Sequence, residues 1–108
     1  MLDCKAIKTR GKECLRLTGS LTIYTVAQAR RDIPALLEKQ GSRVLDLTGI
    51  EEFDTAGVQF LIWLKGEVSG SGTPLAIIHP SAIVAETLDL LRLSSTVCDA
   101  TVVPTPSS

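Results

Sequence analysis

Residues 43–65 read RVLDLTGIEEFDTAGVQFLIWLK and hold the features that decide the fold. The first part is a short apolar run, Val44, Leu45 and Leu47, which is interrupted only by Asp46. Such a run suits a strand that is covered on both faces better than a strand with one face in water. Because sheets covered on both faces are usually parallel, the run predicts a parallel strand in an α/β fold.

A turn and a helix are predicted directly after this strand. Thr48 and Gly49 break the apolar run, an acidic loop follows, and Asp54 stands where a helix needs an acceptor for its unpaired backbone N–H groups. The helix should begin at Thr55, which places this hydroxyl at the positive end of the helix dipole and at the sheet edge where ligands gather. Gly57 lowers helix propensity by about 1 kcal/mol relative to alanine, so we expect another group to pack closely against it. Taken alone, Asp followed by Thr at a helix start most often serves only as a cap.

The two halves of this stretch resemble the central signature of STAS domains, a family that includes anti-sigma factor antagonists and the cytoplasmic tails of sulphate transporters. Residues 46–49 read DLTG and residues 54–57 read DTAG, which match the strand end and the helix start of that signature. The resemblance extends more loosely from Leu15 to Leu93. In the antagonist branch, the residue after the second aspartate is a serine that a partner kinase phosphorylates. Thr55 takes that position here, a conservative departure that leaves phosphorylation possible.

The N-terminal half predicts a hairpin and a helix. Residues 4–9 and 13–18 alternate partly between apolar and polar side chains on either side of a turn signal, which predicts an antiparallel hairpin. Thr25 and Gln28 have the spacing of a capping box and predict a helix that ends at Gly41. Pro34 lies inside this helix and should kink it or divide it into two pieces.

The C-terminal half predicts a strand at residues 75–78, a helix at residues 82–91 capped by Ser81, and a last edge strand at residues 97–103. Strands separated by helices predict an α/β fold: a single domain with a mixed sheet of four to five strands and helices packed mainly on one face. The resemblance to STAS domains implies the same layout. The STAS-like domain should occupy residues 1–103, and residues 104–108 should form a flexible tail.

The composition argues against several classes of protein. The chain has 108 residues, which is the size of one domain, and its formal net charge of −1 argues against nucleic-acid binding through a basic surface. Cys4, Cys14 and Cys98 are odd in number and lack CxxC spacing, so we expect buried or free thiols in a reducing compartment. The chain begins without the pattern of a signal peptide, and no apolar run reaches the ~18 residues of a membrane span. We therefore expect a cytoplasmic protein that meets a membrane only through a partner.

Side chains that could carry catalysis are few. His79 is the only histidine and stands before Pro80 in a predicted loop, without a nucleophile motif. Glu51, Glu52 and Asp54 could hold a cation, but a solvated acidic loop with a helix cap explains them more simply, and the spacing of a calcium loop is missing. The sequence therefore predicts neither an enzyme nor a bound cofactor or metal.

The helix that begins at Thr55 is predicted to have an exposed face that is unusually apolar. At 100° per residue, the core face carries Gly57, Phe60, Leu61, Leu64 and Val68, and the opposite side carries Thr55, Gln59, Ile62, Trp63 and Gly66. Exposed apolar side chains beside a polar position mark a docking surface more readily than scattered ones do. Alternatively, the C-terminal segment or a dimer partner covers Ile62 and Trp63.

These observations predict a protein-binding surface around Thr55 that phosphorylation switches off. Its predicted members are Asp54, Thr55, Ala56, Gly57, Gln59, Ile62 and Trp63. The resemblance implies that the partner is a switch kinase that is also an anti-sigma factor, so that the protein would be an anti-sigma factor antagonist in bacterial transcription regulation.

Other functions stay open from the sequence. Some short STAS proteins, including ones with threonine at the motif, bind the ATPase of a lipid-transport ABC complex, and there Thr55 would be a fixed contact. A third and weaker hypothesis is a small anionic ligand at the helix N-terminus. A homodimer is also left open.

Overall fold

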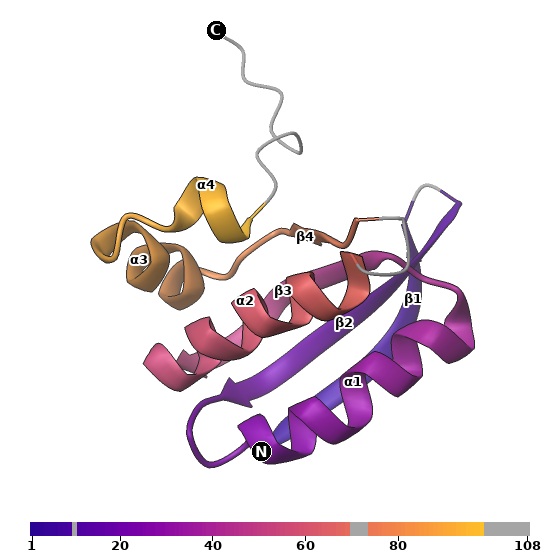
Figure 1. The fold of residues 1–108 in the computed structure, drawn as a ribbon, viewed down its shortest axis with the longest axis horizontal. Helices are drawn as coiled ribbons and strands as arrows, with labels where there is room; N and C mark the ends of the chain where they lie inside the picture. Colours follow the sequence, from indigo (N-terminus) through magenta and orange to yellow (C-terminus); the bar gives the residue numbers. More distant parts are fainter. Residues whose placement is uncertain (10, 70–73, 99–108) are drawn as a thin grey trace, which may run out of the picture.

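The computed structural model describes residues 1–9, 11–69 and 74–98, which form a mixed α/β domain (Figure 1). In chain order the elements are β1 (Leu2–Thr9), β2 (Lys12–Leu21), α1 (Val26–Gln40), β3 (Val44–Phe53), α2 (Thr55–Ser69), β4 (Ala76–Ile78), α3 (Ala82–Leu90) and α4 (Ser94–Val97). The predicted fold class is confirmed.

The strands form one sheet in the order β1-β2-β3-β4. β1 and β2 are the predicted antiparallel hairpin, in which Ala6 lies opposite Leu15. β2 pairs parallel with β3, and β3 pairs parallel with β4, so the sheet is mixed and β3 is its central parallel strand. This topology places the C-terminal ends of β2 and β3 at the same edge of the sheet.

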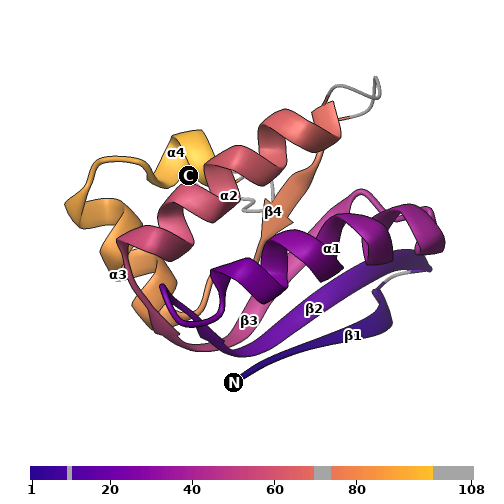
Figure 2. The ribbon, with the colours of Figure 1, turned by 60° about the horizontal axis from the view of Figure 1, so that its bottom comes forward.

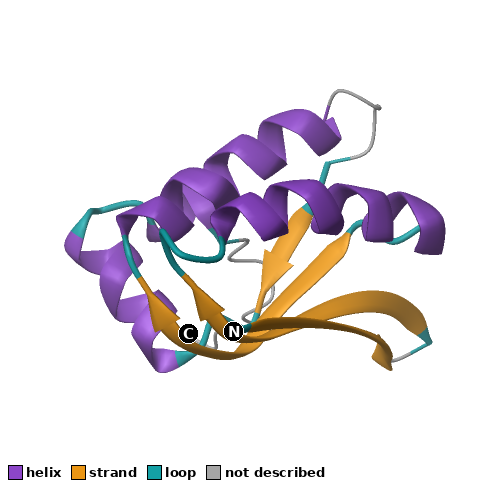
Figure 3. Cartoon of the chain, turned by 90° about the horizontal axis from the view of Figure 1, so that it is seen from below, coloured by secondary structure: helices purple, strands orange, loops and turns teal. Residues whose placement is uncertain are grey.

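The two long helices α1 and α2 lie side by side over one face of the sheet (Figures 2 and 3). The shorter helix α3 contacts β3, and α4 contacts α2 and α3 at the side of this layer. The prediction that the helices pack mainly on one face is confirmed.

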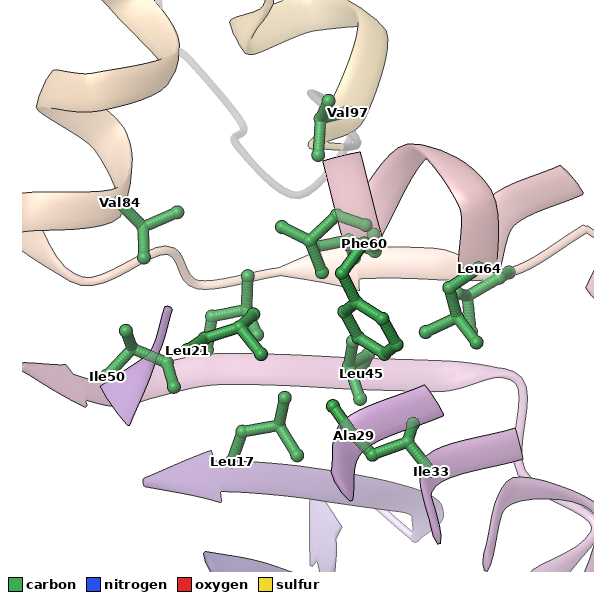
Figure 4. Close-up of a cluster of buried hydrophobic side chains, with 14 of the residues drawn as sticks. Leu17, Leu21, Ala29, Ile33, Leu45, Ile50, Phe60, Leu64, Val84 and Val97 are labelled. Atoms are coloured by element: carbon green, nitrogen blue, oxygen red, sulfur yellow. The ribbon is translucent and has the colours of Figure 1, made fainter. Parts of the chain in front are cut away.

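The hydrophobic core lies between the sheet and this helical layer (Figure 4). Leu17 and Leu45 enter it from neighbouring strands, Ile33 from α1 and Leu64 from α2, and none of these side chains is exposed. Burial of one such side chain stabilises the fold by about 1.5–3 kcal/mol. The core thus fixes α2 over the sheet and places its first turn at the sheet edge.

β3 is longer than the sequence predicts, because it continues through the predicted acidic loop to Phe53. Its pairing with β2 slips twice, and at each slip β3 advances by one extra residue. Each slip changes which residues face the core, so the buried apolar positions are not spaced by two throughout. They are Leu45, Leu47, Ile50 and Phe53. The prediction that Thr48 and Gly49 end the strand is therefore wrong.

α1 begins where Thr25 and Gln28 predict it, but the capping box is not formed. The Thr25 hydroxyl donates to the Ser20 carbonyl at 2.9 Å and makes no cap hydrogen bond. The Gln28 side-chain amide donates instead to the Leu2 carbonyl at 3.2 Å, which ties α1 to β1. Both polar side chains are used to hold α1 to the sheet.

Pro34 does not divide α1, which runs as one helix from Val26 to Gln40. The proline ring removes one backbone donor, and the packing of the surrounding apolar side chains retains the helix. Gly41 ends the helix as predicted, with a left-handed φ of 66°.

The segment after β4 differs from its prediction in two places. Ser81 stands at the N-cap of α3 but makes no side-chain cap hydrogen bond. Val97, predicted to open an edge strand, instead ends α4 and is fully buried, because the core holds its side chain. Residues 99–103 of the predicted strand, and the predicted tail 104–108, lie outside the described residues.

Candidate functional site

The Asp54 carboxylate joins the first turn of α2 to the turn that precedes α1. Its Oδ1 accepts a hydrogen bond from the backbone N–H of Gly57 at 3.1 Å, which is the helix cap expected from the sequence. Its Oδ2 accepts a second hydrogen bond from the backbone N–H of Ile23 at 3.1 Å. The sequence did not predict this second bond, because the two residues are 31 positions apart. One side chain therefore positions two surface segments relative to each other.

Gly57 allows the first turn of α2 to approach the sheet edge closely. A Cβ at this position would overlap the Leu21 carbonyl and lie 2.7 Å from the Phe53 ring. No real Cβ tolerates such contacts without displacement of its neighbours. The close packing expected at Gly57 is confirmed, and it presses the helix start against the ends of β2 and β3.

Thr55 is the first residue of α2, and its side chain is exposed. Gln59 and Ile62 lie on the same helical face and are also exposed, with Ile62 at 43%. Ala56 is half-buried beside them. The helix thus presents a continuous surface that starts at the hydroxyl of Thr55 and ends on an apolar side chain.

Trp63 is less exposed than its position in the sequence suggests. Its ring is half-buried and packs against Phe60, with 5.9 Å between the ring centroids. The Arg30 guanidinium of α1 lies over the indole, 4.4 Å from the ring centroid, in a cation–π contact. α1 therefore covers part of the tryptophan, a contact that the sequence did not predict.

Two exposed apolar side chains that the sequence analysis missed lie beside this surface. Ile23 and Tyr24, in the turn between β2 and α1, are 65% and 92% exposed. In the sequence, the sign of this exposed patch is that two large apolar residues, Ile23 and Tyr24, stand next to each other just before a predicted helix start. The hydrogen bond from the Ile23 amide to Asp54, which is a tertiary contact, shows that this turn adjoins α2.

An open pocket of about 380 Å³ lies between this turn and the end of β3. It is lined by Thr22, Tyr24, Glu51, Glu52, Phe53, Asp54 and Ile83. These lining residues, all in the described part of the chain, include three carboxylates and no basic side chain. The pocket therefore favours cationic groups. Thr55, where the sequence suggested a small anionic ligand, is not among the residues that line it.

Asp46 of the DLTG motif is a structural residue with an exposed fraction of only 1%. Its Oδ1 accepts hydrogen bonds from the Thr48 amide at 2.8 Å and the Thr48 hydroxyl at 2.6 Å, and its Oδ2 accepts one from Arg16 at 3.3 Å. Burial alone would raise the pKa of Asp46, but the hydrogen bonds from Thr48 and the charged Arg16 outweigh it and hold this pKa below its usual range. The ionised carboxylate ties β3 to β2, where Arg16 lies directly opposite.

Over residues 1–9, 11–69 and 74–98, His, Cys, Asp and Glu side chains form no group of three that could hold a metal ion. His79 is exposed, and its carbonyl accepts a hydrogen bond from the Thr48 hydroxyl at 3.5 Å. No helix in this part of the chain has the length and apolar character needed to cross a membrane.

Comparison with protein families agrees with this architecture. Residues 6–103 match the family model described as "Mlab, STAS domain". No curated protein sequence gives a significant match.

Solved structures that match this chain include the following two. The first is the anti-sigma factor antagonist SpoIIAA in its unphosphorylated form, with a TM-score of 0.63, 19% identity, and coverage of 86% of this chain and 84% of that one. The second is an uncharacterized protein of the DUF3478 family from Shewanella loihica, described as having a SpoIIAA-like fold. Its TM-score is 0.47 at 13% identity, with coverage of 84% of this chain and 76% of that one. At these identities the likeness to SpoIIAA shows a shared fold.

Proposed function

Because this chain belongs to the STAS-domain family, we propose that it is a non-enzymatic regulatory protein of the anti-sigma factor antagonist type. In this proposal, the unmodified protein binds a switch kinase that is also an anti-sigma factor, and phosphorylation of Thr55 ends the binding. The observation that supports it most is the exposed Thr55 at the first position of α2, on a turn that the Asp54 carboxylate holds in place.

The proposed docking surface consists of Asp54, Thr55, Ala56, Gly57, Gln59, Ile62 and Trp63. Thr55, Gln59 and Ile62 supply its exposed side chains. Asp54 and Gly57 act mainly by fixing the backbone, because one caps the helix and the other allows its close approach. Trp63 contributes only the part of its ring that α1 leaves uncovered.

Phosphorylation would act mainly on the interface and little on the fold. A phosphate at Thr55 adds about −1.5 to −2 charges at pH 7. The N-terminus of α2 attracts this charge, whereas Asp54 and the acidic pocket oppose it, so the two effects on folding partly cancel. In a complex, the phosphate would have to lose water beside Gln59 and Ile62, and this desolvation weakens binding.

The experiment is to purify the tagged protein from its native host and to analyse one sample twice. Mass spectrometry identifies the co-purifying proteins, and the mass of the peptide that contains Thr55 reports its modification. The proposal predicts a switch kinase together with partly phosphorylated Thr55. An ABC ATPase together with wholly unmodified Thr55 would contradict it.

That second outcome corresponds to the other candidate, a subunit bound to the ATPase of a lipid-transport ABC complex. Two observations favour it: the family model is described as "Mlab, STAS domain", and the motif carries threonine at position 55. In that case Thr55 is a permanent contact, and Thr55→Ala weakens the complex as strongly as Thr55→Glu. The neighbouring genes also discriminate, since a kinase or phosphatase gene supports the first function and transporter genes support the second.

Both candidates share further features of the proposal. The protein acts in the cytoplasm, binds a protein rather than nucleic acid, needs no cofactor, and reaches a membrane only through its partner. A homodimer is compatible with either candidate and would be detected by sedimentation of the purified protein.

A further inference from the structure

The two most exposed large side chains next to the Thr55 surface lie on a turn that the fold holds in place. Ile23 and Tyr24 are 65% and 92% exposed, although isoleucine is among the residues most often buried and tyrosine is commonly buried in part. The Ile23 backbone N–H donates a hydrogen bond to the Asp54 carboxylate, which places this turn beside α2. Tyr24 lines the acidic pocket. Because Ile23 and Tyr24 are adjacent, they form one exposed apolar patch, which marks an interaction site more readily than scattered single residues do.

Several hydrogen bonds fix this turn. The Thr22 amide donates to the Thr25 hydroxyl at 2.9 Å, and the Thr25 amide donates to the Thr22 carbonyl at 2.9 Å. The Thr25 hydroxyl donates in turn to the Ser20 carbonyl at 2.9 Å, and Asp54 holds the Ile23 amide. A turn ordered before binding loses little conformational entropy on binding, which makes a tyrosine there an effective anchor.

The charge beside this anchor is of one sign. Glu51, Glu52 and Asp54 line the pocket next to Tyr24, and the same lining contains no lysine, arginine or histidine. Glu51 and Glu52 are themselves exposed. The Oε1 of Glu52 accepts a hydrogen bond from the Ser20 hydroxyl, so a partner can reach the Glu51 carboxylate and the second oxygen of Glu52. This field repels nucleic acid and anionic lipid, and it attracts a surface that carries lysine or arginine.

We propose that Ile23 and Tyr24, together with Glu51, Glu52 and Asp54, dock a basic surface of a protein partner. Tyr24 enters an apolar hollow on that partner, and lysine or arginine side chains of the partner enter the acidic pocket. The inference rests on the proposed function, since it extends the Thr55 surface across the Asp54 hydrogen bonds and states the chemistry of the partner. It predicts an interface larger than the exposed face of α2 alone.

The first test places the photo-cross-linker p-benzoylphenylalanine (Bpa) at Tyr24 in the native host. Tyr24→Bpa should cross-link to one protein, and the cross-linked peptide of that protein should be rich in lysine and arginine. The matched control is Leu90→Bpa, because Leu90 is 84% exposed at the end of α3 and is not one of the residues that line the pocket. A cross-link to a second copy of this chain, to an acidic peptide, or to no protein overturns the proposal.

The second test measures the affinity of the cross-linked protein, produced in pure form, for variants of this chain. Tyr24→Ala should weaken binding by at least about 10-fold. Glu51→Gln with Glu52→Gln should weaken it about 5-fold at low salt and less at about 0.5 M salt, because screening removes the attraction of exposed charges. Leu90→Ala, at the end of α3, and Glu38→Gln, in the last turn of α1, are the controls and should bind as the unmodified chain does.

The same assay separates this inference from the proposed function. If Thr55→Glu abolishes binding while the Tyr24 and glutamate variants bind normally, the proposed function stands and the basic docking surface is wrong. If those variants weaken binding while Thr55→Glu does not, the docking surface stands and gating at Thr55 is wrong.

Discussion

Gly57 and Gly66 lie in the same helix but have opposite surroundings. A Cβ on Gly57 would overlap the Leu21 carbonyl and the Phe53 ring, whereas a Cβ on Gly66 would meet nothing within 4 Å. The same substitution should therefore have opposite effects at the two positions. Gly57→Ala should lower the free energy of unfolding by about 1–3 kcal/mol, because the helix start must move away from the sheet edge. Urea denaturation followed by circular dichroism measures the change.

Gly66→Ala is the matched control for that prediction. It should raise the free energy of unfolding by about 1 kcal/mol, since alanine has the higher helix propensity and the site has room for its methyl group. For a domain of this size, the expected rise in Tm is about 4–8 °C. Equal effects of the two substitutions would show that Gly57 has no special packing role.

Asp46 should make stability depend on pH in the acid range. The pKa of Asp46 is lower in the folded protein than in the unfolded chain, where it is about 3.9. The unfolded state therefore binds the proton first as the pH falls. The stabilisation by Asp46 is complete above the unfolded pKa and is lost as the pH falls through the folded pKa.

Asp46→Asn tests this dependence. It should lower the free energy of unfolding at pH 7 by about 1–3 kcal/mol, because the charged acceptor of the Thr48 and Arg16 hydrogen bonds is lost. The difference from the unmodified chain should shrink towards pH 3. Thr48→Val removes one donor and should give a smaller effect of the same sign. A difference that stays constant between pH 7 and pH 3 would refute the role assigned to the Asp46 charge.

The two helix starts at Asp54 and Ser81 allow a comparison at the level of elements. Asp54 caps α2 with its side chain and also holds the Ile23 amide, whereas the Ser81 hydroxyl is buried without a hydrogen-bond partner at the start of α3. Asp54→Ala should lower the free energy of unfolding by about 1–2 kcal/mol. Ser81→Ala should cost far less, because a hydroxyl that makes no bond contributes nothing when removed. Thermal unfolding of both variants tests this, and a larger loss for Ser81→Ala would contradict the cap assignment.

The elements that the sequence predicted well are those with local signals. The hairpin, the strand that begins at Val44, and the start of α2 follow from side-chain patterns and from the preference of aspartate for helix caps. The end of β3 did not follow, because two slips in its pairing with β2 break the period of two. The capping box at Thr25 failed for a related reason, since its hydroxyl is taken by the sheet.

The sequence predicted the part of the candidate site that lies on α2, but it did not predict the part that lies on the turn between β2 and α1. Thr55, Gln59 and Ile62 could be placed on one exposed face from helical periodicity alone. Trp63 could not, because the Arg30 side chain that covers it comes from another helix. Tyr24 was missed because its nearness to the site depends on the tertiary hydrogen bond from the Ile23 amide to Asp54. Periodicity describes one element at a time and contains no information about such contacts.

At the scale of the whole molecule, the fold brings two surface segments to one edge of the sheet. The C-terminal ends of β2 and β3 lie together, so the turn after β2 and the first turn of α2 meet at Asp54. The proposed function places a switch, Thr55, at that meeting point. The fold itself contributes rigidity, since the capped helix and the hydrogen-bonded turn present their exposed side chains in fixed positions.

The central claim is that a negative charge at Thr55 ends the binding of the partner. The most direct measurement is the affinity of the purified partner for the unmodified chain, for Thr55→Glu and for Thr55→Ala, by isothermal titration calorimetry. Thr96→Glu, at an exposed threonine of α4, is the control for added charge alone.

We predict that Thr55→Glu weakens binding by at least about 10-fold, since one charge desolvated in an interface costs more than 1.4 kcal/mol. Thr96→Glu should retain the affinity of the unmodified chain, and Thr55→Ala, which removes a small contact but adds no charge, should lose much less affinity than Thr55→Glu. Equal affinities of Thr55→Glu and the unmodified chain would contradict the claim.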